Sequence, residues 1–236
     1  MKGLQTFLAI FIVILSVSIA LARYNVQHIQ RSRPDSEWFY FSVDRETGNR
    51  IKLLERFGTT KEGLPVTKLE EVIPAGCHLA GGYKNYSCGP PLHVHRHQDE
   101  YFTVLKGQLG VVIDGKEHTL TPKDKPARIP AGIRHTFWPA QPDKDVHSHV
   151  ELVQVMESPH PIDFASFIET CYGLGRDYGG PDKINPLQIL LSYTELGGMD
   201  LPVPAPVMWL IRHVGNPLAR LVGYKTHYPE YRSLTA

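Results

Sequence analysis

Cysteine, net charge and internal repetition are all scarce in this sequence, and each shortage narrows the class of protein. Only three of the 236 residues are cysteines, Cys77, Cys88 and Cys171, which is too few for a fold held together by disulfides. The formal net charge of +1 creates no field that would attract nucleic acid or a strongly acidic partner. The sequence also has no repeated unit and no low-complexity tract. What remains is a globular chain, long enough for one domain of ordinary size plus extensions.

A long uncharged run near the N-terminus is the first positive feature. No residue from Phe7 to Ala22 is charged, and residues 20–22 have the small-x-small pattern that signal peptidase recognises. Counted from Leu4, the run has about the length that spans a bilayer. Two interpretations stay open: a cleaved signal peptide of a secreted protein, or an uncleaved transmembrane helix. We favour an anchor in the endomembrane system (the endoplasmic reticulum), because the run is longer than most signal-peptide cores.

Composition divides the chain into four parts. Residues 1–23 are the hydrophobic signal or membrane anchor, and the mostly polar residues 24–37 are a linker. Between residues 38 and 158, short apolar or alternating runs are separated by Gly, Pro and Asp turn signals, which is typical of an all-β barrel or sandwich. Residues 159–236 are a helical C-terminal extension. The predicted strands cover residues 38–43, 50–54, 66–73, 101–105, 109–113, 118–120, 127–129 and 150–155.

The C-terminal extension has apolar residues at helical spacing. Helices are predicted over 162–171 and 185–191, the second beginning with an Asn cap and a Pro in its first turn. In a third apolar segment, Val207 to Tyr224, the sequence Gly215-Asn216-Pro217 should break the helix in two. The extension could cover the barrel, build a homodimer interface, or lie on a membrane surface with Trp209 and Leu210 inserted. We favour the first arrangement.

Four side chains of ligand type define the candidate site. His93 and His95 lie two residues apart, so on a β-strand both imidazoles project from one face. Glu100 follows after a gap that breaks strand parity, which implies a short turn bringing the next strand back past the same centre. His135 comes just after a Pro-Ala-Gly turn at 130–132. Three imidazoles and one carboxylate suit Fe(II), Mn(II), Ni(II), Cu(II) or Zn(II) and leave coordination positions open.

The spacing of these residues resembles the two motifs of the cupin superfamily, H-x-H-(x)4-E-(x)6-G and P-x-G-x-x-H. The resemblance implies a single cupin barrel, a double-stranded β-helix or jelly roll, with a metal bound inside by the three histidines and Glu100. The second motif departs from the family pattern at Asp124, where a Gly is usual, and at Pro139, where an Asn is usual. Neither position is a ligand, so the departures concern loop shape. The matching residues are His93, His95, Glu100, Gly107, Pro130, Gly132 and His135.

Strand parity predicts the surroundings of the metal. If Glu100 points inward, Phe102 and Val104 share its face, and Phe137 accompanies His135 in the same way. A largely apolar lining around one charged centre is typical of a small-molecule pocket.

Three further histidines lie near the motifs without completing them. His97 shares strand parity with His93 and His95, but we expect the strand to end there. His147 and His149 repeat the H-x-H spacing without a Glu or Gly at the required distance. We interpret all three as lying outside the ligand set.

Two features favour a luminal barrel. Cys77 and Cys88 could pair across adjacent strands in an oxidising compartment, which would leave Cys171 free. Asn85 begins the one usable glycosylation sequon, so it is the candidate glycosylation site.

The favoured function is that of a metal-dependent oxidoreductase, similar to the small dioxygenase-like cupins of secondary metabolism. The expected cofactor is Fe(II), with Mn, Ni, Cu or Zn as alternatives, and the expected partners are a small apolar organic substrate and O2. Glu100 is the expected catalytic residue, since it could loosen on substrate binding and act as a base.

Two alternatives stay open. A non-redox isomerase, cyclase or lyase could use the same ion as a Lewis acid, with Glu100 or a nearby histidine moving a proton. A secreted cupin could also bind a ligand without catalysis, although such proteins often lack some of the ligands that this chain retains.

Overall fold

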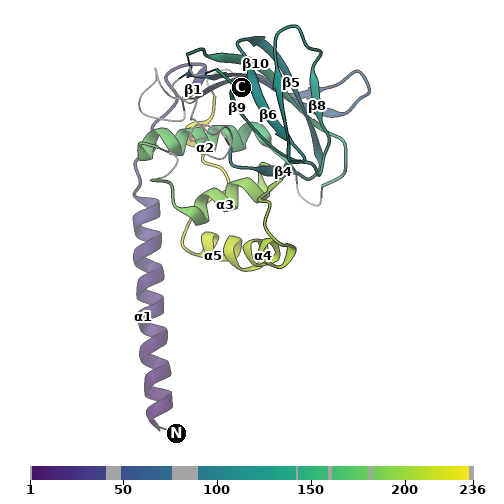
Figure 1. Ribbon diagram of the computed structural model, residues 1–236. Coiled ribbons are helices and arrows are strands. Elements are labelled where there is room, and N and C mark those ends of the chain that lie inside the picture. The colour runs from purple at the N-terminus through teal and green to yellow at the C-terminus, as the bar shows by residue number, and fades with distance from the viewer. Residues whose placement is uncertain are drawn as a thin grey trace.

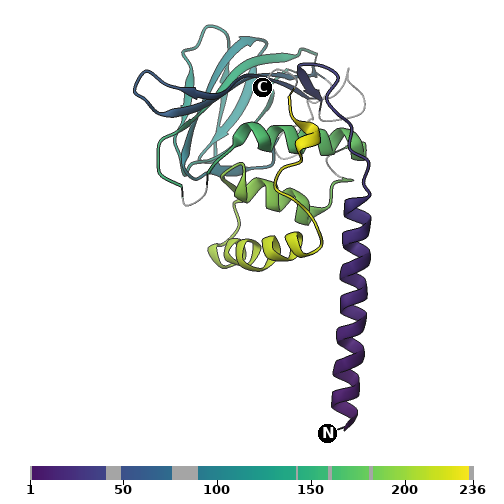
Figure 2. The ribbon, with the colours of Figure 1, turned by 180° about the vertical axis from the view of Figure 1, so that it is seen from behind.

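The computed structural model describes residues 2–40, 49–75, 90–141, 143–158, 161–180 and 183–233, with side chains from residue 15 onward and at Val13. Its body consists of two antiparallel β-sheets with helices packed against one end (Figure 1). Helix α1 (Lys2–Gln27) projects away from this body, as the view from behind also shows (Figure 2). Within these residues no helix has both the length and the apolar character needed to cross a membrane, so the predicted transmembrane helix is not found there.

The two sheets confirm the predicted mainly-β class. The larger sheet has the order β1-β2-β3-β10-β5-β8, and the smaller one has the order β11-β4-β9-β6-β7. Every neighbouring pair of strands is antiparallel. The strands are β1 (Trp38–Tyr40), β2 (Arg50–Thr59), β3 (Pro65–Ile73), β4 (His93–His95), β5 (Gln98–Lys106), β6 (Leu109–Ile113), β7 (Lys116–Leu120), β8 (Ala127–Ile129), β9 (Arg134–Pro139), β10 (Val146–Gln154) and β11 (Met199–Asp200).

The core lies between the sheets, where alternate residues of each strand point inward. Phe102, Val104 and Phe137, which strand parity places beside the candidate ligands, are at most 7% exposed. The Phe102 and Phe137 rings pack with their centroids 4.9 Å apart. Each such side chain contributes about 1.5–3 kcal/mol when fully buried. The interior beside the ligands is therefore apolar.

Helix α2 (Phe164–Tyr178) covers one end of the barrel. Asp163 caps it by accepting a hydrogen bond from the Ser166 N–H at 2.9 Å, and the helix ends at Gly179, whose φ is +79°. Arg56 of β2 forms an ion pair with Glu169 of α2, whose side chain has no exposed surface. This pair fastens the helix across the sheet, so the first of the three expected arrangements is the one observed for α2.

Helix α3 (Pro186–Glu195) packs against α2 and begins at the residues that the sequence predicts. The Asn185 side chain accepts a hydrogen bond from the Leu187 N–H at 2.9 Å, and Pro186 occupies the first turn.

The predicted break at Gly215-Asn216-Pro217 is wrong. Helix α4 (Ala205–Leu210) continues through a π-helical turn, η4 (Ile211–Gly215), into α5 (Asn216–Leu221), and a short 3-10 turn, η5 (Pro229–Tyr231), follows. The Asn216 N–H bonds the Ile211 carbonyl five residues earlier. A proline interrupts an α-helix because its ring clashes with the preceding turn, and the wider π turn relieves that clash.

Several predicted features lie outside the described residues. They are the glycosylation candidate Asn85, the proposed Cys77–Cys88 pair and the end of the first predicted strand, residues 41–43. Cys171, on α2, is a free and buried thiol, and burial raises its pKa well above the ordinary value. A thiol in that state is a packing residue rather than a nucleophile.

Candidate metal centre

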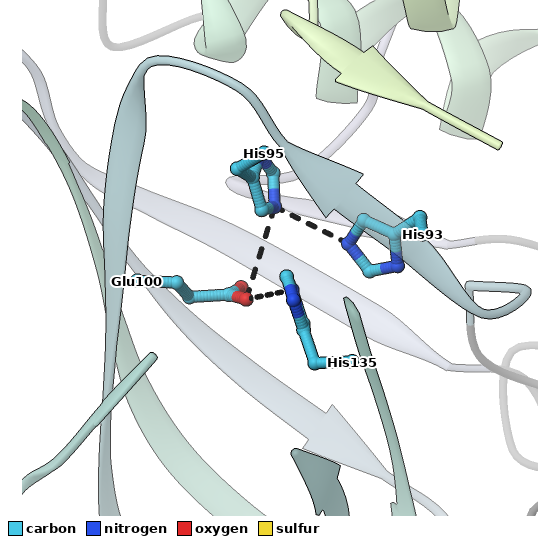
Figure 3. Close-up of side chains that lie close together, drawn as sticks. All are labelled: His93, His95, Glu100 and His135. Atoms are coloured by element: carbon cyan, nitrogen blue, oxygen red, sulfur yellow. Dashed lines mark hydrogen bonds and ion pairs between the residues drawn. The ribbon is translucent and has the colours of Figure 1, made fainter. Parts of the chain in front are cut away.

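The structure brings all four predicted ligand residues together between the two sheets. His93 and His95 project from β4, and His135 projects from the neighbouring β9, where it is the register partner of His93. Glu100 reaches the same point from β5, which belongs to the other sheet. The chain passes between the sheets at residues 96–97, which is the short turn that the broken parity predicts. Figure 3 shows the four side chains converging.

The four ligand atoms lie within 4.8 Å of one another. The Nε2 atoms of His93 and His95 are 3.2 Å apart. Oε2 of Glu100 lies 2.7 Å from Nε2 of His135 and 3.8 Å from Nε2 of His95. Two nitrogen or oxygen ligands at right angles on one divalent ion are separated by about 3 Å, because each lies about 2.0–2.2 Å from the ion. The four residues are at most 3% exposed.

Hydrogen bonds to the backbone set the tautomers of two of the imidazoles. Nδ1 of His93 lies 2.9 Å from the Pro91 carbonyl, and Nδ1 of His135 lies 2.9 Å from the Ile133 carbonyl. A carbonyl oxygen only accepts, so each Nδ1 carries a hydrogen and Nε2 is the ring atom left to bind a metal ion. The Nε2 atoms face the centre of the cluster.

Charge also favours a cation at this point. Burial, together with the neighbouring imidazoles, lowers the pKa of His93 and His95 well below the ordinary value, so both are neutral. Burial also lowers the pKa of His135, but the Glu100 carboxylate outweighs it and the net pKa is raised. Three imidazoles and one carboxylate, buried with their donor atoms converging, form a set that fits a divalent metal ion once His135 has given up its proton.

Asp99 supports the turn that delivers His135, a role that sequence reasoning missed. Its buried Oδ1 accepts the Ala131 N–H at 2.9 Å, and Oδ2 accepts from Nε of Arg128 at 2.6 Å. The Gly132 N–H donates to the His95 carbonyl at 2.7 Å, with φ of Gly132 at +84°. These bonds fasten the turn to β5, which bears Glu100, and to β4, which bears His95.

We expect Asp99→Ala to weaken metal binding about tenfold to a hundredfold, because residues that orient ligands typically have effects of that size. A competition titration with a chromogenic chelator would measure the affinity. Asp124→Ala is the matched control, since Asp124 accepts the Thr121 N–H at 2.8 Å in an exposed turn. Equal metal affinities for the two variants would contradict the role assigned to Asp99.

A cavity of about 70 Å³ adjoins the cluster, and His93, His95 and Glu100 form part of its wall. This space exceeds that of a single water, and its lining is mostly apolar. Helix α2 forms the roof, where the Phe164 ring lies 5.6 Å from that of His95. The apolar part of the wall includes Ile51, Leu69, Phe137, Phe164, Phe167 and Ile168.

Glu71 is a second carboxyl group on the cavity wall, which sequence reasoning also missed. It is 3% exposed, and its Oε1 accepts a hydrogen bond from Nδ2 of Asn49 at 2.8 Å. Burial raises its pKa to about 8, and the charge of Glu100 acts in the same direction. Glu71 is therefore protonated at neutral pH. Strand parity could have located it, since Glu71 stands between Leu69 and Ile73 in an inward-facing row of β3.

The remaining candidate histidines lie outside the cluster. His97 follows the end of β4, and His147 and His149 are half-buried on β10. Among the described residues, the one group suited to metal binding is His93, His95, Glu100 and His135.

Comparisons with known proteins agree with this geometry. A family model described as "Cupin domain" matches residues 86–148, which include all four candidate ligands. "Probable oxidoreductase virH" of Hypocrea virens is 32% identical over 158 residues, covering 63% of this chain and 70% of that protein. The chain belongs to the cupin superfamily. "Oxidoreductase iacF" of Pestalotiopsis fici is 34% identical over 146 residues, 56% of this cupin and 66% of the relative.

A third relative of this cupin is "Epoxidase atD" of Aspergillus terreus, 32% identical over 61% of this chain and 47% of its own length. The matches therefore span from about half to about two thirds of the relatives' lengths. Among solved structures, a cupin-2 domain from Rhodospirillum rubrum matches 58% of this chain and 83% of its own, with 16% identity and a TM-score of 0.36.

Proposed function

We propose that this cupin is a metal-dependent, dioxygenase-like oxidoreductase that acts on a small lipophilic metabolite with O2, in secondary-metabolite biosynthesis. The observation that carries the proposal is the convergence of three imidazoles and a carboxylate beside an apolar cavity that α2 covers. The oxidoreductase and epoxidase names of the matched relatives support it.

The protein's own residues would bind and orient the substrate. The apolar walls and the α2 roof favour a lipophilic molecule and exclude water, which strengthens every electrostatic interaction inside. His93, His95, His135 and Glu100 would hold the ion, and a redox-active ion such as Fe(II) would supply electrons for O2 chemistry. Glu100 also faces the cavity, where its carboxylate could accept a substrate proton.

A non-redox isomerase, cyclase or lyase is the second candidate, and one observation favours it. Glu71 and Glu100 line the same cavity, and burial keeps Glu71 protonated at neutral pH. Two carboxyl groups, one held as an acid, could move a proton across a substrate without any change in oxidation state.

Metal replacement separates these candidates. We expect metal-free protein refilled with Fe(II), or with Mn(II), Ni(II) or Cu(II), to turn over its substrate only in air, and protein refilled with Zn(II) to be inactive. Oxygen uptake and product analysis across a panel of phenolic and β-diketone compounds would measure this. Turnover of the Zn(II) protein without O2 would favour the isomerase or cyclase. Absence of turnover with every metal would favour a binding protein.

We also propose that residues 1–23 direct the chain to the endomembrane system, with a secreted form after signal cleavage as the alternative. N-terminal sequencing of protein from its native host distinguishes them: a retained segment preserves Met1 or Lys2, and cleavage after Ala22 gives an N-terminus at Arg23.

A further inference from the structure

The continuous helix formed by α4, η4 and α5 turns its polar face toward the protein and its apolar face toward solvent, the reverse of an ordinary surface helix. A surface helix buries its apolar stripe against the core and turns its polar side chains to solvent. Here the polar side chains contact the body of the protein, and most of the large apolar side chains point outward.

Three polar side chains of this helix bind partners on the body. Arg212 forms an ion pair with Asp200 of β11. Nδ2 of Asn216 donates to Oγ1 of Thr194 at 2.9 Å, and Arg220 donates to Glu195 at the end of α3. The buried face of the helix is therefore held by hydrogen bonds and ion pairs, with Met208 and Ala219 packed between them.

The opposite face is an apolar stripe with helical spacing. Its five members recur every three or four residues and are each 41–53% exposed. Trp209 flanks the stripe and is 56% exposed, with its ring 4.8 Å from that of His213. An exposed contiguous apolar face of this kind marks an interaction surface. The stripe consists of Val207, Leu210, Val214, Leu218 and Leu221.

A second apolar surface lies at the same end of the molecule. The chain just beyond α5 meets α1, where a β-carbon built on Gly223 would lie 3.7 Å from Cα of Arg23. From this junction α1 extends past the layer formed by α4 and α5, away from the barrel (Figure 1, Figure 2). Four large apolar side chains of α1 are 49–61% exposed, namely Val13, Leu15, Val17 and Leu21.

The segments that form these surfaces, residues 2–27 and 205–229, contain basic residues and no acidic ones. No Asp or Glu occurs between residues 205 and 229, whereas Arg23 and Lys225 are exposed beside the junction. Tyr24 of α1, 58% exposed, is a second exposed aromatic side chain on these segments. Basic residues favour anionic headgroups, and exposed Trp and Tyr side chains favour the boundary between headgroups and acyl chains.

We propose that the α4–η4–α5 stripe lies on an anionic lipid membrane, with the helix parallel to the surface and the exposed apolar side chains of α1 in contact with the same lipid. A lipid phase covers both apolar surfaces at once, although they belong to elements that run in different directions. A second copy of the chain would have to match each surface separately. The proposal is independent of the reaction that the barrel catalyses.

Vesicle binding by the full chain tests this proposal. We expect the double variant Leu210→Glu, Leu218→Glu to bind phosphatidylcholine vesicles containing phosphatidylserine at least tenfold more weakly than the unaltered chain. Binding weakens because the variant loses the burial of two leucines in lipid, and because the new carboxylates repel the anionic headgroups. Phe57→Glu is the matched control, because Phe57 is 72% exposed on β2, and its affinity should stay within twofold.

The fluorescence of Trp209 reports contact of lipid with α4 and not with α1, because α1 contains no tryptophan. Vesicles containing brominated lipid should quench the fluorescence of the unaltered chain and quench Trp209→Phe markedly less, with the β-sheet circular dichroism unchanged in both. Equal quenching, or unchanged vesicle affinity for the double variant, would overturn the proposal. A lipid-free dimer that the double variant converts to monomer would overturn it in favour of a second copy.

Discussion

Replacement of both His95 and His135 by alanine should abolish stoichiometric metal binding and leave the β-fold largely intact. The two residues supply half of the ligand set, from strands β4 and β9, and their loss leaves too few donors to displace water from a divalent ion. The sheets are held by their own hydrogen bonds and by the apolar core, so the fold does not depend on the ion. Metal analysis after gel filtration, together with circular dichroism, measures both effects.

A matched control is available on β10. His147 and His149 have the same H-x-H spacing but lie outside the cluster, so their double alanine variant should retain one equivalent of metal. Glu100→Gln should weaken binding less than loss of a histidine, because the amide oxygen remains a donor while the negative charge disappears. One equivalent of metal in the His95 and His135 double variant would rule out the ligand assignment.

Glu71→Gln should make the metal-free protein more stable at alkaline pH, by as much as about 5 kcal/mol. Burial raises the pKa of Glu71 from 4.5 to about 8, so the native state binds the proton more tightly than the unfolded state does. Stability from this group is fully present below pH 4.5 and is lost as the pH rises through 8. The difference between the two pKa values corresponds to that free energy. Glutamine keeps an oxygen for Asn49 but has no proton to lose.

Urea denaturation at pH 5, 7 and 9 measures this prediction. The variant should lose the pH dependence that Glu71 causes and exceed the unaltered protein most at pH 9. Glu70→Gln serves as the control, because Glu70 neighbours Glu71 on β3 but is only half-buried. Parallel pH profiles for Glu71→Gln and the unaltered protein would show that the carboxyl is charged in the native state.

The positions of His93, His95 and Glu100 were predictable from neighbouring residues, and His135 was predictable from the cupin motif that it completes. Strand parity within β4 places His93 and His95 on one face, and the short turn before Glu100 follows from the change in parity. The β6 and β8 bounds agree with the predicted runs, since each is limited by adjacent turn residues. Where side chains within a few residues determine the local structure, that structure can be predicted from the sequence alone.

The features that were missed depend on contacts between distant segments. Asn49, just before β2, donates to Glu71 of β3, and Asp99 accepts from Ala131, which lies 32 residues later in the chain. The π turn before Pro217 was missed for another reason, because a proline in an apolar segment is compatible with either a break or a local widening. Only packing against the body decides between them, through bonds such as that of Asn216 to Thr194.

Strand β11, which belongs to the C-terminal extension, pairs with β4, the strand that carries His93 and His95. Met199 of β11 pairs with His95 in the register of the sheet and also lines the cavity, and the Arg96 N–H donates to the Gly198 carbonyl at 3.1 Å. The edge of the ligand-bearing strand β4 is therefore completed by residues about a hundred positions later in the chain. For protein engineering, this means that the barrel and its extension are not interchangeable modules. A graft that replaced the extension would also replace the outer partner of the strand that holds two of the four ligands.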